Sequence, residues 1–396
     1  MKEYLLKDLF EPPISGVWGN ELTEGQKGIK VLRTTNFTND GRINYDEVVE
    51  RDIDLKDDRK ILRKHDIIIE KSGGGPEQPV GRVVFLNKET DLENEVYVCN
   101  NFTAILRPRQ GFNKKYLFYI LMNLYNRGVV LKFQNKTTGI SNLKLKDYLK
   151  TTKVNIPNIQ TQQKIADVLD KAQFLIDKRK EQIKECDRLI ESLFYDMFGD
   201  PATNPKGWSC RSFKSVARIA TISADMDEIG EDDLYVGLEH IEKDTGKILE
   251  YVRAKDVDLK SDKFKFNEGM ILYGKLRPYL NKVALIKQSG VCSTDILPIL
   301  PNNDFINIYY LLYYMRDRYF VNSMTQRAIG ANLPRVNKRV INSFRIMLPP
   351  LELQNEFARK VEKIEHQKQL LEKSLSLMED NFNSLMQKAF RGELFS

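Results

Sequence analysis

The chain has 396 residues, of which 41% are hydrophobic and 30% are charged, enough for two or three domains with hydrophobic cores. No apolar run is long enough to cross a bilayer and the first residues carry no apolar signal stretch, so we expect a cytoplasmic protein that does not associate with membranes. The four cysteines and three histidines are scattered, which argues against disulfides, a metal site and a Ser/His/Asp triad.

The net charge of +7 is unevenly distributed along the chain. Residues 110–160 carry nine basic side chains and one acidic one, and residues 269–351 carry eleven basic and three acidic ones. A basic segment in the same place in both halves predicts two surfaces that face a polyanion. The alternative interpretation is that these cations are simply solvated on helix faces.

The first globular domain is predicted over residues 1–155, as a mixture of short strands and one helix. Apolar residues at helical spacing predict that helix over residues 114–126. Two segments, 72–76 and 134–139, are rich in glycine or polar residues and are predicted to be irregular loops. Strands are expected at residues 30–35, 66–70, 81–86 and 100–106, with a turn at 39–41.

The second globular domain is predicted over residues 199–347 and repeats this order. A helix is expected at 304–320, and loops at 274–279 and 326–330. Strands are expected at 235–238, 269–273 and 283–286, with a turn at 244–246.

Each domain is followed by a predicted long helix, over residues 156–198 and 348–396. A shift of 192 residues places Ile156–Asp200 on Leu348–Gly392 without a gap, with Gln162 on Gln354. Both helices carry apolar residues in a heptad pattern, which predicts a packed seam between them. The seam residues are Ile165, Leu169, Ile176, Ile183, Ile190 and Leu193 in the first helix, and Phe357, Val361, Ile364, Leu371, Leu375, Phe382 and Leu385 in the second.

The frame expected from this repeat is an antiparallel pair of helices of about 60 Å that separates two globular domains. Two binding domains a few tens of ångströms apart suit a split target on one face of duplex DNA, where one helical turn spans about 34 Å. Paired helices also serve as inert spacers in scaffold proteins, so the frame alone leaves both interpretations open.

Apart from Arg33, which follows the first predicted strand, the candidate DNA contacts lie in two loops per domain, residues 72–82 and 134–144 in the first and 274–282 and 326–338 in the second. Glycines allow close approach to a phosphate, and an arginine can bind guanine with two hydrogen bonds. The alternative is a surface loop without a ligand. Asn142 and Asn332, which both precede leucine, are interpreted as turn or cap residues. The candidate contacts are Arg33, Gly74, Arg82, Lys136, Thr138, Lys144, Lys275, Arg277, Tyr279, Lys282, Arg327, Arg335 and Lys338.

No catalytic or metal-binding motif emerges from the sequence. Glu70 and Lys71 resemble part of a nuclease site, but neighbours on a strand point to opposite faces. There is no GxxxxGK[ST] loop, no GxGxxG turn and no Asn-Pro-Pro-aromatic motif of amino-methyltransferases. A chain with two basic domains and no catalytic motif is expected to be the recognition part of a larger enzyme.

Over essentially its full length the sequence resembles the specificity (S) subunits of type I restriction–modification systems. The resemblance lies in Ile156-Pro157-x-x-x-x-Gln162-x-x-Ile165-Ala166 and in Leu348-Pro349-Pro350-x-x-x-Gln354-x-x-Phe357-Ala358, each opening a long helix. The helix ends, Leu193-Phe194-x-x-Met197-Phe198-Gly199-Asp200 and Ala389-Phe390-Arg391-Gly392-Glu393-Leu394, fit as well.

The resemblance implies an α+β fold with two repeated target recognition domains, separated by long antiparallel, coiled-coil-like helices. It also implies that each domain binds half of an asymmetric, interrupted DNA site. The helices set the gap and dock two methyltransferase (M) subunits, joined by restriction (R) subunits, with one copy of this chain per complex. S-adenosylmethionine, ATP and magnesium belong to the partners, and this chain holds no cofactor. The alternatives are a stand-alone DNA methyltransferase or nuclease, and a coiled-coil scaffold that does not bind DNA.

Overall fold

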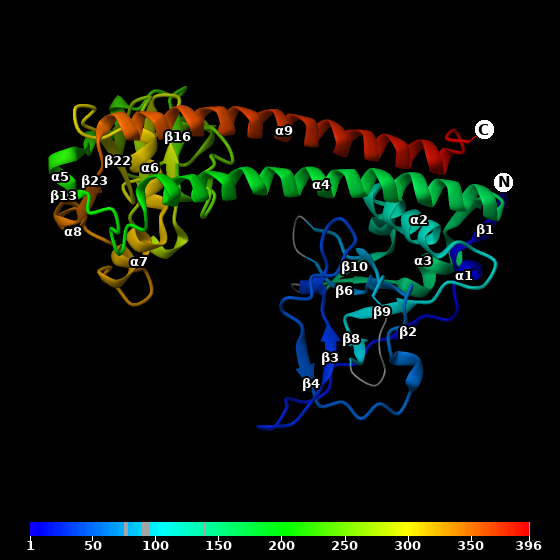
Figure 1. Ribbon diagram of the computed structural model, residues 1–396. Helices are drawn as coiled ribbons and strands as arrows, with labels where there is room; N and C mark the ends of the chain where they lie inside the picture. The colour runs from blue at the N-terminus through cyan, green and yellow to red at the C-terminus, as the bar shows by residue number, and fades with distance from the viewer. Residues whose placement is uncertain (75–77, 89–94, 138–139, 396) are drawn as a thin grey trace. The chain divides into compact units, whose positions relative to one another are not determined.

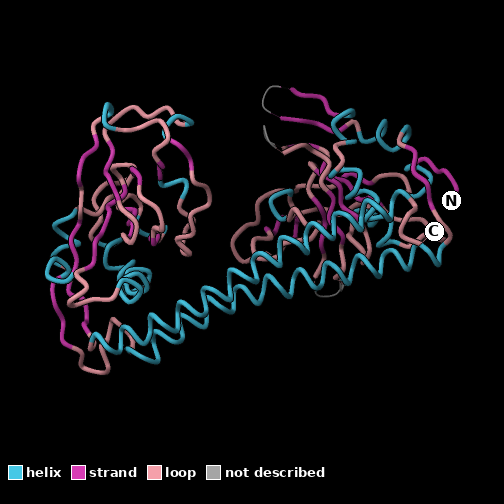
Figure 2. Tube along the Cα trace, turned by 90° about the horizontal axis from the view of Figure 1, so that it is seen from above, coloured by secondary structure: helices cyan, strands magenta, loops and turns pink. Residues whose placement is uncertain are grey.

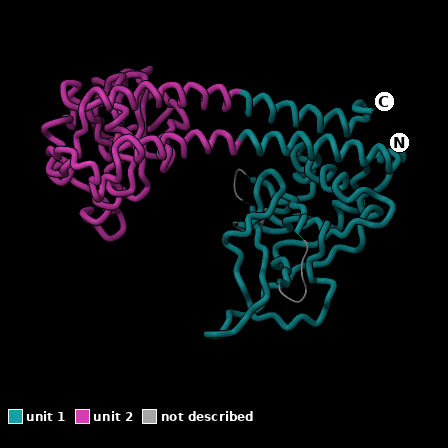
Figure 3. The backbone as a smooth tube through the Cα atoms, viewed as in Figure 1, with its two compact units in different colours: residues 1–179, 374–396 teal, residues 180–373 magenta. Residues whose placement is uncertain are grey.

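The computed structural model describes residues 1–74, 78–88, 95–137 and 140–395, with the backbone alone described at 136–137. The chain divides into two compact units, one formed by residues 1–179 with 374–396 and the other by residues 180–373 (Figure 3). Two long helices, α4 (Ile159–Phe198) and α9 (Leu351–Arg391), contribute one part to each unit. Each unit is described by itself below.

Unit 1 is built on small, mostly antiparallel sheets. Its central sheet has the order β2-β9-β5-β7, and a second sheet has the order β4-β3-β8, in which β3 and β8 run parallel. The strands of these two sheets are β2 (Ile14–Ser15), β3 (Ile29–Leu32), β4 (Val49–Arg51), β5 (Ile67–Glu70), β7 (Val83–Phe85), β8 (Tyr97–Cys99) and β9 (Thr103–Leu106). The other elements are β1 (Lys2–Leu5), β6 (Ser72–Gly73), β10 (Gln134–Thr137), β11 (Ile140–Leu143), β12 (Lys153–Ile156), α1 (Leu6–Leu9), α2 (Lys114–Asn126) and α3 (Leu145–Thr151).

Unit 2 repeats these two sheets, with two additional strands, β15 and β18, in the second. Its central sheet has the order β14-β22-β19-β20, and its second sheet, β15-β18-β21-β16-β17, again contains one parallel pair, β16 with β21. The strands are β13 (Ser209–Ser212), β14 (Ala217–Ile219), β15 (Ile222–Ala224), β16 (Leu234–Val236), β17 (Val252–Arg253), β18 (Lys263–Phe266), β19 (Ile271–Gly274), β20 (Val283–Leu285), β21 (Gly290–Cys292), β22 (Ile296–Pro301) and β23 (Arg345–Leu348). The shorter helices are α5 (Phe213–Val216), α6 (Ile308–Arg316), α7 (Arg318–Gln326) and α8 (Lys338–Ser343). The strand orders therefore confirm the predicted repetition of the globular halves. Figures 1 and 2 show the strands and short helices of each unit beside its own part of the long helices.

A short two-stranded sheet leads into each long helix. In unit 1, β1 pairs antiparallel with β12, and α4 begins three residues after β12 ends. In unit 2, β13 pairs antiparallel with β23, and α9 begins three residues after β23. Pro157 and Pro349 lie between strand and helix in the two copies, where a proline ends the strand ladder because it has no N–H to donate.

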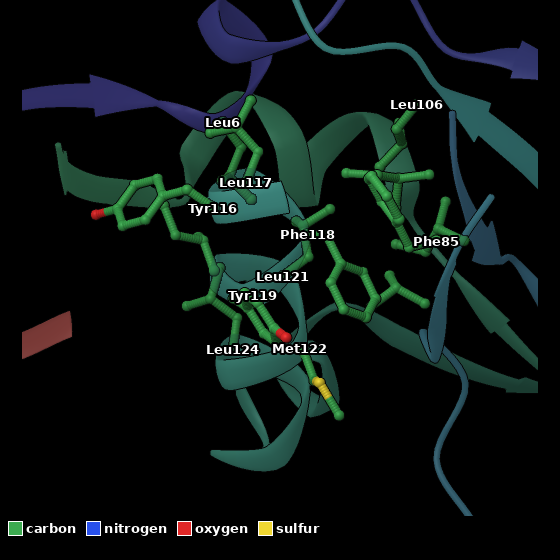
Figure 4. Close-up of a cluster of buried hydrophobic side chains, with 14 of the residues drawn as sticks. Leu6, Phe85, Leu106, Tyr116, Leu117, Phe118, Tyr119, Leu121, Met122 and Leu124 are labelled. Atoms are coloured by element: carbon green, nitrogen blue, oxygen red, sulfur yellow. The ribbon is translucent and has the colours of Figure 1, made fainter. Parts of the chain in front are cut away.

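The core of unit 1 surrounds α2, which Figure 4 shows beside Leu6, Phe85 and Leu106. The sequence predicted this helix with the correct ends and one apolar face. In the structure every residue from Tyr116 to Leu124 is buried, because α2 is covered by the central sheet and by the long helices on different sides. Asn113 begins the helix by accepting a hydrogen bond from the Tyr116 N–H, at 2.8 Å.

The long helices pack antiparallel, as predicted. In unit 1 the early part of α4 shares a core with the late part of α9, and in unit 2 the late part of α4 shares a core with the early part of α9. Ile165, Leu169, Ile176, Ile190, Phe357, Val361 and Phe382 are buried in these cores, while Leu193, Ile364, Leu375 and Leu385 are half-buried against them. Ile183 and Leu371 are half-buried and lie between the two cores.

Three local predictions are wrong. The expected helix at 304–320 is two helices, α6 and α7, because Asp317 is extended and caps α7 through the Tyr319 N–H. Residues 134–137 are not a loop but strand β10, which pairs with β11. Ser72 and Gly73 are not irregular either, because they form β6 against β11. The partner of β6 lies about 70 residues away in sequence, so local composition gave no signal for that pairing. β10 pairs with the strand that directly follows it, but its polar composition hid the strand.

The aromatic core of unit 2 provides a stability test. Phe357 is fully buried, with the rings of Phe198 and Phe194 at 5.2 and 5.7 Å, so Phe357→Ala leaves a cavity. We expect it to lower the free energy of unfolding by about 3–5 kcal/mol. Phe174→Ala, on a side chain 56% exposed on α4, should change it by less than about 0.5 kcal/mol. Urea unfolding measures both, and equal losses would contradict this packing.

Candidate nucleic-acid interface

In unit 2 the two predicted loops are joined by backbone hydrogen bonds. Leu276 and Arg335 form an antiparallel bridge. The Arg277 N–H donates to the carbonyl of Pro334 at 2.7 Å, and the Val336 N–H donates to the carbonyl of Lys275 at 3.0 Å. Side chains from residues about 60 positions apart are thereby brought to one place beyond the end of β19.

Unit 1 makes the same junction at the end of its own central strand, β5. Ser72 pairs with Asn142, and the Leu143 N–H donates to the carbonyl of Lys71 at 2.7 Å. Lys71 therefore occupies the place of Lys275, and Asn142 that of Arg335. The interpretation of Asn142 as a turn or cap residue is wrong, because Asn142 lies in strand β11 and its Oδ1 accepts the Ser72 hydroxyl at 2.6 Å.

Each junction includes a third residue, which directly precedes the strand that pairs with the central one. This residue is Phe102 before β9 in unit 1 and Asp295 before β22 in unit 2. The Lys71 N–H donates to the carbonyl of Phe102 at 2.7 Å, and the Lys275 N–H donates to that of Asp295 at 2.9 Å. Phe102 is 44% exposed. The two junctions thus share one backbone and a lysine but differ at the other two positions. We refer to them as the reading junctions: Lys71, Phe102 and Asn142 in unit 1, and Lys275, Asp295 and Arg335 in unit 2.

In the unit 2 reading junction, Asp295 forms ion pairs with both Arg335 and Lys275. The Asp295 carboxylate accepts two hydrogen bonds from Arg335, both at 2.9 Å, and lies 3.8 Å from the Lys275 ammonium. Arg335 holds the pKa of Asp295 below its usual range, and Asp295 raises the pKa of Arg335. The paired guanidinium is oriented but still exposed, as a group that contacts a base edge or phosphate must be.

A strained turn carries two more predicted residues beside this junction. The 3₁₀ turn Pro278–Leu280 lies between Arg277 and Asn281, whose φ angles of 52° and 48° are left-handed. Such conformations cost about 1–3 kcal/mol each and persist only where the surroundings impose them. Here the amide of Asn281 donates to the carbonyl of Arg316 at 3.0 Å. The turn leaves Tyr279 50% exposed and Arg277 exposed.

Lys338 extends the basic surface from the start of α8. Its ammonium donates to the Thr221 hydroxyl and lies 5.4 Å from the centre of the Phe264 ring. Partial burial, and then the positive charge of Lys275, lower its pKa. The contribution of Lys275 indicates that the charges of the two lysines are close enough to interact.

Arg82 and Lys282 were predicted to contact DNA, but both side chains bind other groups of the protein. The Arg82 guanidinium binds the Glu70 carboxylate, with its Nε 3.1 Å from Oε2, and the Glu70 side chain is 1% exposed. It also donates to the carbonyls of Thr34 and Phe37. Lys282 makes the matching contact in unit 2 by donating to the carbonyl of Leu238 at 2.7 Å. Both cations hold the 3₁₀ turn that follows β3 or β16, so the geometry argues against them as DNA contacts.

The remaining predicted residues are spread over both units. Lys144 is exposed at the start of α3, and Arg327 is exposed beside the Phe344 ring. Arg33 donates to the Glu47 carbonyl at 2.9 Å and is half-buried. Gly74 has a φ of 71°, which favours glycine, while Lys136 is placed by its backbone in β10 and Thr138 lies outside the described residues.

Sequence reasoning missed Lys71 and Phe102 as members of a junction. A lysine directly after the buried strand in both copies, Glu70-Lys71 and Gly274-Lys275, was a usable signal. The side chains of Phe102 and Asp295 are chemically unlike, so only the backbone hydrogen bonds reveal that the two positions are equivalent.

Two further properties concern the residues that the structure describes. Within 1–74, 78–88, 95–137 and 140–395, no group of three or more His, Cys, Asp or Glu side chains is placed to hold a metal ion. In the same part of the chain, no helix combines the length and the apolar character needed to span a bilayer.

Two repeated α+β units, each with a reading junction and each joined to paired long helices, define a two-domain recognition protein. The sequence profile of the type I restriction modification DNA specificity domain matches residues 1–185 and 206–379. The chain therefore belongs to the specificity subunits of type I restriction–modification systems.

Individual relatives agree with this assignment. The chain is 32% identical to the EcoDI specificity subunit of Escherichia coli over 195 residues, which is 48% of this chain and only 43% of that subunit. It is 21% identical to the MjaVIII specificity subunit of Methanocaldococcus jannaschii over 406 residues, covering 94% of this chain and 87% of that one.

Solved structures show the same fold. A chain from a structure concerned with complex assembly and conformational transition of the type I R-M system aligns with a TM-score of 0.57 and 13% identity, over 99% of this chain and 98% of that one. The S subunit of the type I system from M. genitalium aligns with a TM-score of 0.53 and 13% identity, over 98% of this chain and 96% of that one.

The internal role of Arg82 can be tested by its effect on stability. Arg82→Ala leaves the buried Glu70 carboxylate unpaired, so we expect the free energy of unfolding to fall by about 3–5 kcal/mol. Arg277→Ala, on an exposed side chain, should change it by less than about 0.5 kcal/mol. Chemical denaturation measures both, and a fully stable Arg82→Ala protein would show that the ion pair is dispensable.

Proposed function

We propose that this subunit is non-catalytic and that its two globular domains, residues 1–155 and 199–347, each bind one half of an asymmetric, two-part DNA site. The supporting observation is the pair of reading junctions, with the same backbone in both units but Phe102 and Asn142 in one and Asp295 and Arg335 in the other. Base edges are distinguished by their donor and acceptor patterns, so unlike side chains on like backbones suit two unlike half-sites.

Within unit 2, Arg277, Tyr279 and Arg335 are the proposed base contacts, because they are exposed on a turn and bridge of fixed geometry. Lys144, Arg327 and Lys338 are the proposed phosphate contacts, since exposed cations can position a protein on DNA through its phosphates without reading its sequence.

The long helices, residues 156–198 and 348–396, are proposed to set the gap between the half-sites and to dock two methyltransferase subunits. Docking is supported by large apolar side chains that remain exposed on them, at 47–65%. These residues are Phe174, Leu175, Leu189, Leu370 and Leu377. One copy of this chain in the cytoplasm would join methyltransferase and restriction subunits, which supply the sites for S-adenosylmethionine, ATP and magnesium.

The gap can be tested by shortening both helices together. Residues 181–187 and 368–374 lie opposite each other, as the Lys368–Asp187 ion pair shows, and contain the seam residues between the two cores. Deleting both heptads removes about 10.5 Å of helix. At roughly 3.4 Å per base pair, the preferred gap should shorten by about three base pairs.

The measurement is the gap in the sites that the subunit and its methyltransferase partner modify in a cell. Deleting residues 181–187 alone puts the two heptad patterns out of step and should destabilise the helix pair. An unchanged gap in the double deletion would refute the spacer role.

Arg277→Ala tests the proposed base contact. We expect about tenfold or more loss of discrimination at one half-site, since a good arginine–guanine pair contributes about 1–3 kcal/mol. Lys338→Ala is the control, because loss of a phosphate contact weakens binding to all sequences and lowers the salt dependence. Competition binding with half-site variants measures both, and uniform weakening by Arg277→Ala would make it a phosphate contact.

A further inference from the structure

A buried glutamine ties each unit to its own long helix. Gln162, near the start of α4, is 2% exposed. Its Oε1 accepts a hydrogen bond from the backbone N–H of Asn113 at 2.9 Å, and its Nε2 donates to the carbonyl of Pro157 at 2.9 Å. The side-chain amide thus connects the beginning of α2, inside the globular part, to the beginning of the long helix.

Unit 2 repeats this contact atom for atom. Gln354, near the start of α9, is fully buried. Its Oε1 accepts from the backbone N–H of Asn307 at 2.9 Å, and its Nε2 donates to the carbonyl of Pro349 at 2.8 Å. We call these two sets of contacts, Gln162 with Asn113 and Gln354 with Asn307, the glutamine clamps.

The asparagine of each clamp has a second and a third contact. Asn113 Oδ1 caps α2 and Asn307 Oδ1 caps α6, each accepting from a tyrosine N–H at 2.8 Å. Their amide groups donate to Gln163 Oε1 at 2.6 Å and to Asn355 Oδ1 at 2.9 Å, both on the long helices. The internal repeat aligns Gln162 with Gln354, but these asparagines were not predicted. The available signal was an Asn before an apolar helix at nearly the same distance from each glutamine, 49 and 47 residues.

A clamp of this kind fixes direction as well as position. An apolar side chain would fill a buried position equally well. A buried amide is tolerated only when its hydrogen bonds are made. Here both ends of each amide bind backbone groups, so α2 or α6 is held at one angle and height on the long helix. The reading junctions have diverged between the units, whereas the clamps have not.

We infer that Gln162 and Gln354 are positioning residues that fix the gap length of the DNA site. This inference rests on the proposed function, in which each unit reads one half-site. Each clamp sets the orientation of a reading junction relative to the long helix. Without the clamp, each unit keeps its half-site preference, but its orientation on the long helix varies. The protein then also binds sites whose gap is one base pair longer or shorter.

The experiment selects bound duplexes from a random-sequence DNA pool with the full-length chain and sequences them. This gives the half-sites and the gap-length distribution together. Gln162→Met and Gln354→Met keep side-chain length and remove the hydrogen bonds. We expect unchanged half-sites and about a two- to tenfold loss of preference for the main gap over gaps one base pair longer or shorter. This is the range for the one hydrogen bond between each glutamine and the backbone N–H of Asn113 or Asn307. Gln367→Met, an exposed position on α9, is the matched control and should leave the distribution unchanged.

The outcomes separate this inference from the proposed function. Wild-type selection without two half-sites at a fixed gap would overturn the proposed function. A fixed gap that stays equally sharp in both methionine variants would overturn the clamp alone. If those variants do not fold, Gln163→Ala and Asn355→Ala remove the outer contact of each clamp and leave Gln162 and Gln354 in place. Gln163→Ala also removes a hydrogen bond to Asp167 within α4, so Asp167→Ala is its control. A broader distribution in Gln163→Ala and Asn355→Ala supports the inference, and an unchanged one overturns it.

Discussion

The burial of the two heptad seams against each other is the interaction on which the rest of this protein depends. Neither α4 nor α9 is expected to be a stable helix alone, because an isolated helix with an exposed apolar stripe gains little stability in water. Pairing buries the stripe, and each unit adds its own aromatic and aliphatic residues to one end of the pair. Because each helix begins at a strand of its own unit, the globular folds and the helix pair are stabilised together.

Duplication explains how one backbone arrangement carries different side chains in the two units. Strand order, parallel pairing and the backbone of the reading junctions recur in both units, so these features are set by hydrogen bonding that is largely independent of side chains. The side chains at the same positions are free to differ. Lys71 and Lys275 keep a positive charge, whereas Asn142 and Arg335 offer different hydrogen-bonding groups.

Arg82 shows why cations counted in a sequence are poor guides to a binding surface. A surface arginine and one paired with a buried carboxylate look the same in sequence, yet Glu70 is 1% exposed and requires a partner. Lys282 makes the related contact in unit 2 with a backbone carbonyl instead of a carboxylate. The internal repeat was informative here, because two residues at the same place make the same kind of contact.

The sequence by itself determined the family, the duplication, the long helices and their seam, because heptad periodicity and capping signals are local and survive without tertiary contacts. Only the tertiary structure decided which loop residues meet. Pairing of β6 with β11 and of Leu276 with Arg335 joins segments far apart in sequence, and the hydrogen bonds of such pairs leave no periodic pattern. The break at Asp317 and the burial of Arg82 were likewise set by neighbours that composition does not reveal.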